Sequence, residues 1–311
     1  MHLCIDLPPT FGGVAHVLLK KIVVSSGNAV HFVSDQYVIP TIKGEERKSR
    51  AGVSTQCTYA ITGPKQKRPI NWQEALKNWH FKDSMIKFLV DYWQSDEFET
   101  IIGNKLLFIN YGNICYGFSV IQGKVVRRIV HELCNYHEEA DSRMVFHIIH
   151  LPRPNNVVVT TQDTDIMVIL LGCMDELGQG LKISLDLGIN SNNSRRFLSI
   201  NQLANNLGSN ICQSLPEFHA LTGSDYTAAF GRKGKIRPFK NLSANPAAQN
   251  ALKVLGQSES IEEKTFQEIE KFVCQLYGKN DLDSLDDVRL EVFLKRYTPK
   301  KWPAVFCNKK S

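Results

Sequence analysis

A strand that leads directly into two carboxylates and then into an apolar helix is the feature that most constrains the fold of this chain. Residues 156–174 have the sequence NVVVTTQDTDIMVILLGCM, with three valines ahead of Asp163 and Asp165. A β-branched run that ends in turn-forming and acidic residues is typical of a buried strand followed by a helix. Strands that alternate with helices pack as a parallel sheet with helices on its faces. This stretch therefore favours an α/β fold.

Predicted strands and helices alternate through the first two-thirds of the chain. Strands are expected at residues 29–33, 101–110, 124–130 and 181–188, and helices at residues 11–24, 72–95 and 137–151. Turn-forming residues make residues 51–70 a predicted loop. From about residue 200 the pattern is mostly helical. The sequence thus predicts an α/β core over residues 1–200, with a parallel sheet flanked by helices, and a helical region over residues 201–311.

Two of the expected helices are amphipathic and have a predicted core face. In the helix at residues 72–95 this face contains Trp79, Met85, Phe88 and Leu89. In the helix at residues 137–151 it contains Met144, Ile148 and Leu151.

The composition is that of a soluble globular protein, with 43% hydrophobic and 22% charged residues. No apolar run approaches the about 20 residues that span a bilayer, and the start MHLCIDLPPTFGG has no signal-peptide pattern. An intracellular location is therefore expected, without a membrane partner. The 8 cysteines form no CxxC pair, so we expect reduced thiols rather than disulfides or zinc ligands. The net charge of +6 is compatible with a polyanionic partner.

Acidic residues fall repeatedly at the end of a predicted strand or the start of a predicted helix. The positions are Asp35, Glu139, Asp141, Asp163, Asp165 and Asp225. Ligands of an open parallel sheet bind at the carboxyl ends of its strands. Carboxylates that meet there repel one another unless a cation is present, and oxygen ligands suit Mg²⁺ or Mn²⁺.

Helix capping is an alternative, purely structural interpretation of the same acids. Acidic residues at helix N-termini cap the helix and interact favourably with its dipole. Capping alone would account for Glu139 and Asp141 at the start of one helix, and for Asp163 at the start of another. The order of all the acids along the chain is what favours the metal-binding interpretation.

That order resembles the flap-endonuclease-like (5′-nuclease) superfamily, within the wider PIN-like fold. The motifs that carry the resemblance are EEADSR with Glu139 and Asp141, TTQDTDIMVIL with Asp163 and Asp165, and LTGSDYTAAFGRKGK with Asp225. VHFVSDQYVIPTIKGEERKSR resembles the strand that carries the family's second acid, followed by a basic arm. The motifs are similar in particular to those of an animal group with EADTR, DTDV and HALTGCDTTSAFFGKGK-like stretches. The resemblance covers roughly residues 10–245.

The resemblance implies a PIN-like α/β fold, a helix–turn–helix-like element in the helical region, and a metal-dependent nuclease that recognises nucleic-acid structure. Two Mg²⁺ or Mn²⁺ ions would be held by Asp35, Glu139, Asp141, Asp163, Asp165 and Asp225. DNA or RNA would be the substrate, which favours the nucleus over the cytoplasm. The residues implied in backbone binding are Arg47, Lys48, Arg50, Gly231, Arg232, Lys233, Gly234 and Lys235. For the basic arm at Arg47, Lys48 and Arg50, a solvated helix face is the alternative.

Two departures from the family keep a second function open. The family begins with a strand that ends in its first acid and is followed by a helix, where this chain has only MHLCID before LPPTFGG. Either Asp6 takes the place of that first acid, or the first strand is absent. Pro238 is tolerated only in a first helical turn, which predicts that the second helix of the motif begins at Ile236 or Arg237. The alternative function is a catalytically inactive nucleic-acid-binding or scaffold protein, a truncated gene product that retains the fold.

Overall fold

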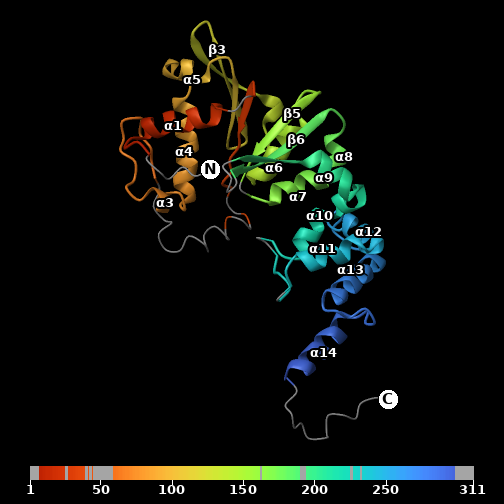
Figure 1. The fold of residues 1–311 in the computed structure, drawn as a ribbon. Helices are drawn as coiled ribbons and strands as arrows, with labels where there is room; N and C mark the ends of the chain where they lie inside the picture. The colour runs from red at the N-terminus through yellow and green to blue at the C-terminus, as the bar shows by residue number, and fades with distance from the viewer. Residues whose placement is uncertain are drawn as a thin grey trace, which may run out of the picture. The chain divides into compact units, whose positions relative to one another are not determined.

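The computed structural model describes residues 7–24, 27–38, 41, 44, 59–161, 163–189, 194–224, 227–231 and 233–297. The chain divides into two compact units (Figure 1). The first unit contains residues 1–166 and 179–181, and the second contains residues 167–178 and 182–311. Each unit is treated separately below.

The first unit contains a four-stranded sheet in the order β1–β2–β3–β4. The strands are β1 (Ala29–Phe32), β2 (Leu106–Tyr111), β3 (Ile114–Ile121) and β4 (Lys124–Ile129). Strand β1 pairs parallel with β2, with Val30 opposite Leu107. The other two pairs of this sheet, β2–β3 and β3–β4, are antiparallel.

Strand β3 lies between the predicted strands at residues 101–110 and 124–130, where no strand was predicted. Tight hairpin turns on both sides determine its direction. Gln122 and Gly123 join β3 to β4 with φ of 50° and 73°, and positive φ at both central positions is the requirement of a type I′ turn. Gly112, with φ of 56°, begins the turn between β2 and β3. Two-residue turns can connect only antiparallel strands. The prediction of a parallel sheet is therefore wrong for β2, β3 and β4.

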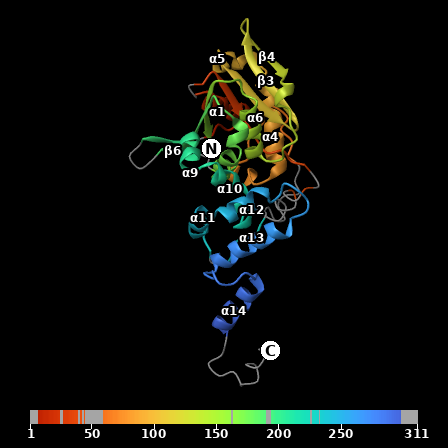
Figure 2. The ribbon, with the colours of Figure 1, turned by 90° about the vertical axis from the view of Figure 1, so that its right-hand side faces the viewer.

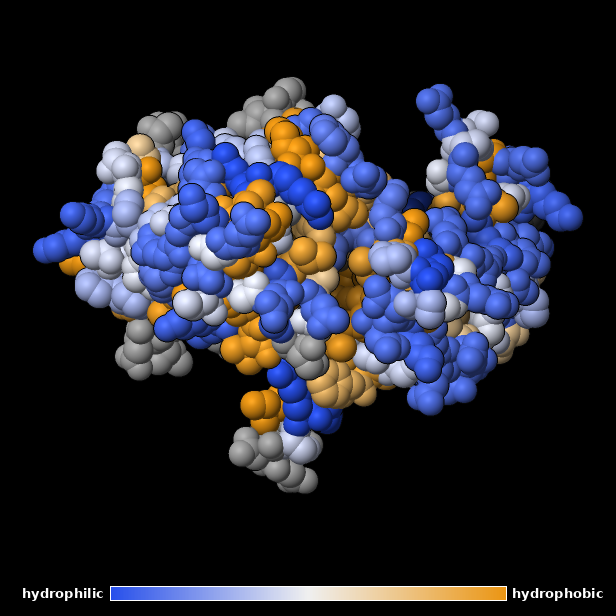
Figure 3. Space-filling model, turned by 90° about the horizontal axis from the view of Figure 1, so that it is seen from above, coloured by the Kyte–Doolittle hydropathy of each residue, from blue (hydrophilic) through white to orange (hydrophobic). Residues whose placement is uncertain are grey.

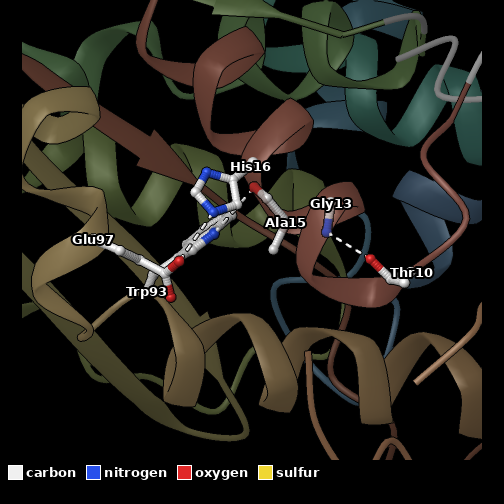
Figure 4. Close-up of polar contacts among 6 residues, drawn as sticks. All are labelled: Thr10, Gly13, Ala15, His16, Trp93 and Glu97. Carbon is white, nitrogen blue, oxygen red and sulfur yellow. Dashed lines mark hydrogen bonds and ion pairs between the residues drawn. The ribbon is translucent and has the colours of Figure 1, made fainter. Parts of the chain in front are cut away.

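Helices α1 (Phe11–Val23) and α4 (Trp79–Tyr92) pack against each other beside β1 and β2 (Figure 1). The Thr10 side chain caps α1 by accepting the N–H of Gly13 at 3.3 Å, and the indole N–H of Trp93 donates to the Ala15 carbonyl at 3.3 Å (Figure 4). Phe11, Leu19, Phe81, Leu89 and Trp93 are among the buried residues of this core.

The single helix predicted for residues 72–95 is two helices, α3 (Trp72–Ala75) and α4. The side chain of Asn78 accepts the N–H of Phe81 and so starts a new helix there. Met85, Phe88 and Leu89 are buried as predicted, whereas Trp79 is only partly buried. The shorter elements of the unit that follow are η2 (Asp96–Phe98), α5 (Glu99–Ile102) and η3 (His131–Leu133).

Helix α6 (Ala140–Ile149) precedes the strand–acid–helix segment. That segment forms as predicted, with strand β5 (Asn155–Thr160) and helix α7 (Asp165–Gly172). A second sheet has the order β5–β6–β7, with β6 at Leu181–Ile189 and β7 at Arg195–Ser199. Strands β6 and β7 are antiparallel, with Ser184 opposite Ser199. The fold is therefore mixed α/β with two small sheets, as the sequence predicts at that level.

The described chain from residue 200 to residue 297 is mostly helical, as predicted for this region (Figure 2). Its helices are α9 (Ile200–Leu207), α10 (Ser209–Leu221), α11 (Ile236–Ser243), α12 (Pro246–Val254), α13 (Glu263–Leu276) and α14 (Leu285–Tyr297); the short α8 (Met174–Leu177) precedes them. Phe218, Leu242, Leu252 and Phe272 are buried among α10 to α13.

Polar and charged side chains cover most of the face shown in Figure 3, with hydrophobic patches between them. None of the helices within the described ranges is both long enough and apolar enough to span a membrane. Cys115, Cys134, Cys173, Cys212 and Cys274 are free, in keeping with the expected reduced thiols.

Candidate carboxylate site

The N-terminus of α6 brings together two of the predicted acidic segments. The backbone N–H of Ala140 donates to Oδ1 of Asp35 at 3.0 Å, across 105 residues of sequence. The backbone N–H of Gln36 donates to the carbonyl of Glu138 at 2.8 Å. The segment that follows β1 is therefore bonded twice to the start of α6.

The side chain of Glu139 does not cap helix α6, so the structural interpretation of this acid as a helix cap does not hold. Glu139 occupies the N-cap position of α6, with φ of −89° and ψ of 140°, yet its side chain makes no capping hydrogen bond. Asp35 caps this helix instead, from a distant part of the sequence. Asp141 lies in the first turn of α6. Asp35, Glu139 and Asp141 are all half-buried and belong to one helix terminus.

Asp163 and Asp165 lie together at the start of α7, but their hydrogen bonds are those of a helix cap. Oδ1 of Asp163 accepts the N–H of Asp165 at 3.0 Å, and the N–H of Asp163 donates to Oγ1 of Thr161 at 3.0 Å. Such short-range bonds from Asp and Thr side chains are typical of turns that initiate helices. Helix capping, the structural interpretation of these acids, therefore occupies one carboxylate oxygen of Asp163, Oδ1.

Several predicted residues lie outside the part of the chain that the structure describes. These are the last predicted metal ligand, Asp225, the basic arm Arg47, Lys48 and Arg50, and Arg232 of the glycine turn.

The glycine turn ahead of α11 is described at Gly231, Lys233, Gly234 and Lys235. The ammonium group of Lys233 lies 4.8 Å from the ring centroid of Tyr277. That of Lys235 lies 2.9 Å from Nδ1 of His219 and 3.3 Å from its carbonyl oxygen. Both lysines thus have an interaction within the protein. Helix α11 begins at Ile236, as predicted from the position of Pro238.

The described carboxylates do not by themselves form a metal site. Among the residues that the structure describes, no three or more His, Cys, Asp or Glu side chains lie close enough together to hold a metal ion. The oxygen ligands at the starts of α6 and α7 are of the type that Mg²⁺ prefers. Since Asp225 lies outside the described ranges, the predicted six-carboxylate set is described only in part.

Arg143, which the sequence analysis did not single out, is fully buried on α6. Its guanidinium donates to the carbonyl oxygens of His137 at 2.7 Å, Ser34 at 3.3 Å and Gly112 at 2.5 Å, and to Oε1 of Gln36 at 2.5 Å. Burial lowers the pKa of Arg143, and the negative charge of Asp35 opposes this effect. Arg143 lies one helical turn before His147, outside the predicted core face of Met144, Ile148 and Leu151.

His147, one turn beyond Arg143, is buried as well, so the inward face of α6 differs from the predicted one. Arg143, Val145, His147 and Ile148 are buried, whereas Met144 and Leu151 are only partly buried. Nδ1 of His147 lies 2.9 Å from Nδ1 of His31 on β1. Nε2 of His147 is buried without a hydrogen-bond partner.

The two histidines are held in the neutral form. Burial lowers the pKa of His31 to about 4. Burial, and then the neighbouring His31, Arg143 and His150, lower the pKa of His147 to about 3. The ring of His31 also stacks on Phe108 of β2, with a centroid distance of 4.4 Å. The pair therefore joins α6 to β1 through one hydrogen bond between uncharged rings.

Comparison of the chain with protein-family models, with curated proteins and with solved structures finds no significant match in any of the three.

Proposed function

We propose that this chain is a metal-dependent, structure-selective nuclease that hydrolyses phosphodiester bonds in DNA or RNA. The observation that carries the proposal is the hydrogen bond from the Ala140 N–H to Asp35. It brings one predicted carboxylate segment to the helix terminus that carries two further predicted ligands. Asp35, Glu139 and Asp141 are half-buried at this terminus, and carboxylate oxygens are ligands that Mg²⁺ prefers.

In this proposal the oxygen ligands come from Asp35, Glu139, Asp141, Asp163, Asp165 and Asp225. A bound divalent cation would lower the pKa of a bound water and stabilise negative charge on the scissile phosphate. The chain itself fixes Asp35 on the N-terminus of α6, where exposed backbone N–H groups add positive potential. A carboxylate held in this way needs little reorganisation when a ligand binds.

The proposed substrate-binding element is α10, the glycine turn and α11, taken as a helix–turn–helix-like unit. Support comes from the start of α11 at Ile236, directly after Lys235. An added Cβ at Gly231 or Gly234 would meet no atom within 4 Å, so the backbone there is open to a phosphate group. Arg47, Lys48, Arg50, Arg232, Lys233 and Lys235 would contribute positive charge, and a PIN-like core would carry the carboxylates.

A second candidate function is a nucleic-acid-binding protein without catalysis. One observation favours it: no group of three metal-binding side chains occurs within the described ranges. The helix-capping bond of Asp163 points in the same direction, because it gives this acid a structural role. Binding of branched nucleic acid without cleavage would distinguish this function from the first.

A cleavage assay tests the proposal directly. Purified protein is incubated with flap, branched and single-stranded DNA and with single-stranded RNA, in Mg²⁺ or Mn²⁺. We expect cleavage by the unmodified chain, and a loss of about 10²-fold or more in Asp163→Ala and in Asp35→Asn, because electrostatic stabilisation of this kind contributes on that scale.

The matched control is Asp91→Asn, which removes an acid of the first unit that pairs with Arg127 at the surface. Such pairs contribute little to stability, so this variant should retain full activity. Absence of cleavage by a folded, unmodified chain on every substrate would contradict the nuclease function.

A further inference from the structure

The two residues that flank Asp35 in the sequence, Ser34 and Gln36, are both hydrogen-bonded to the buried guanidinium of Arg143. Arg143 donates through Nη1 to the carbonyl of Ser34 and through Nη2 to the side chain of Gln36. The residue between them, Asp35, accepts the N–H of Ala140. The position of the Asp35 backbone is therefore determined from both sides by one side chain of α6.

The same guanidinium also connects two further segments to this point. Its Nε donates to the carbonyl of His137, just before α6, and Nη2 donates to the carbonyl of Gly112 in the turn between β2 and β3. Arginine has five N–H donors in a fixed planar arrangement, and four of these bonds are made here. A lysine has three donors on one nitrogen and cannot reach acceptors placed around a plane in this way.

Burying the charged side chain of Arg143 costs free energy of folding, so packing alone does not explain why an arginine occupies this position. Val145 and Ile148 on the same helix are buried hydrophobic residues, and hydrophobic residues of similar volume often replace buried charges without loss of stability. A buried cation close to carboxylates, however, lowers their mutual repulsion before any metal binds. Asp35 interacts electrostatically with Arg143.

We infer that Arg143 is a positioning residue for the candidate carboxylate site. It fixes the segment Ser34–Gln36 so that the Asp35 carboxylate stays bonded to the N-terminus of α6 at Ala140 in the metal-free protein. The role as part of a metal site rests on the proposed function, whereas the placement of Asp35 can be tested without it.

The backbone amide of Ala140 reports this placement directly. Its hydrogen-exchange rate is measured by NMR on protein labelled with ¹⁵N-alanine, with the signal assigned from Ala140→Ser. In the unmodified chain the amide is protected by its hydrogen bond to Asp35. In Arg143→Lys and Arg143→Met we expect exchange at least about 10-fold faster, because the hydrogen bond to Asp35 is no longer held.

Val145→Ala is the matched control for general loss of stability. Val145 is buried on the same helix, and its truncation leaves a cavity without affecting the contacts of Asp35. If Val145→Ala, at equal loss of thermal stability, accelerates the Ala140 amide as much as Arg143→Lys does, the positioning role is overturned. Unchanged exchange of the Ala140 amide in Arg143→Lys would overturn it as well.

A second readout separates the positioning role from the proposed function. Mn²⁺ affinity, measured by electron paramagnetic resonance, should fall by about 10- to 100-fold in Arg143→Lys, as for other residues that orient metal ligands. If the unmodified chain binds no Mn²⁺ and cleaves nothing, the proposed function fails, and the Ala140 amide still decides whether Arg143 positions Asp35. If Mn²⁺ binds equally well to both proteins, the metal-site role of Arg143 fails while the nuclease function stands.

Discussion

At the scale of single residues, the stretch TGSDYTAAFGRKGK contains glycines with different structural requirements. Gly223 has φ of 111°, and a Cβ added there would lie 2.7 Å from Cα of Ala229. Gly231 has open space around the same position. Glycine is therefore required at position 223 by the positive φ and by the close approach of Ala229, whereas packing does not require a glycine at position 231.

We expect Gly223→Ala to lower the free energy of unfolding by about 2 kcal/mol or more, since strained backbone at positive φ alone costs about 1–3 kcal/mol. Gly231→Ala should change it by less than about 0.5 kcal/mol. Urea unfolding of the two variants, monitored by circular dichroism, checks the difference. Equal stability of the two variants would contradict this account of Gly223.

At the scale of elements, α6 and β1 are joined by polar groups that the apolar pattern did not reveal. Sequence periodicity identified α6 and its buried Ile148 correctly. It also predicted Met144 and Leu151 on the inward face, where they are only partly buried, and it missed the buried Arg143 and His147. Hydrophobic patterns cannot show that an arginine will be buried, because its acceptors come from residues 34, 36, 112 and 137. Only the folded chain brings these acceptors together.

The histidine pair between these elements makes the stability of the protein depend on pH. The pKa values of His31 and His147 in the folded protein, about 4 and about 3, lie below the value near 6.5 of an unfolded chain. As the pH falls below about 6.5, the unfolded state binds protons first, so stability is lost towards the folded pKa values. Between pH 7 and pH 5 each histidine should contribute a loss of about 2 kcal/mol.

Denaturant unfolding at pH 7 and pH 5 measures this loss. His147→Gln should decrease the difference between the two pH values by about 2 kcal/mol, because glutamine does not titrate. The control is His131→Gln, which replaces an exposed histidine and should leave the difference unchanged. A difference of the same size in His147→Gln and the unmodified chain would contradict the assignment of neutral, buried rings.

At the scale of the whole molecule, the proposed metal site couples ligand binding to stability. A ligand that binds only the folded state at 100 times its dissociation constant stabilises it by about 2.7 kcal/mol. We therefore expect Mn²⁺ to raise the melting temperature of the unmodified chain in a concentration-dependent way. Asp35→Asn should remove this effect, because it removes a proposed ligand.

Differential scanning fluorimetry at increasing Mn²⁺ checks the shift. Glu132→Gln serves as the control, since Glu132 is an exposed acid of the same unit outside the carboxylate set. An equal shift in Asp35→Asn and in the control would mean that the cation binds elsewhere on the surface.

Some local elements of this protein follow from the amino-acid sequence alone. The valine run, the two acids and the apolar run at residues 156–174 form the predicted strand and helix, and Pro238 places the start of α11 at Ile236. These outcomes depend on residues within one or two turns of one another, so propensity and periodicity are sufficient.

Tertiary structure decided the pairing of strands and the composition of the carboxylate site. Strand β3 forms because tight turns at Gly112 and at Gln122–Gly123 fold the chain back on both sides. Asp35 caps a helix that begins 105 residues later, and Arg143 is buried because carbonyl oxygens from separate segments surround it. The contacts of Asp35 and Arg143 depend on three-dimensional proximity of residues distant in sequence, which no local pattern encodes.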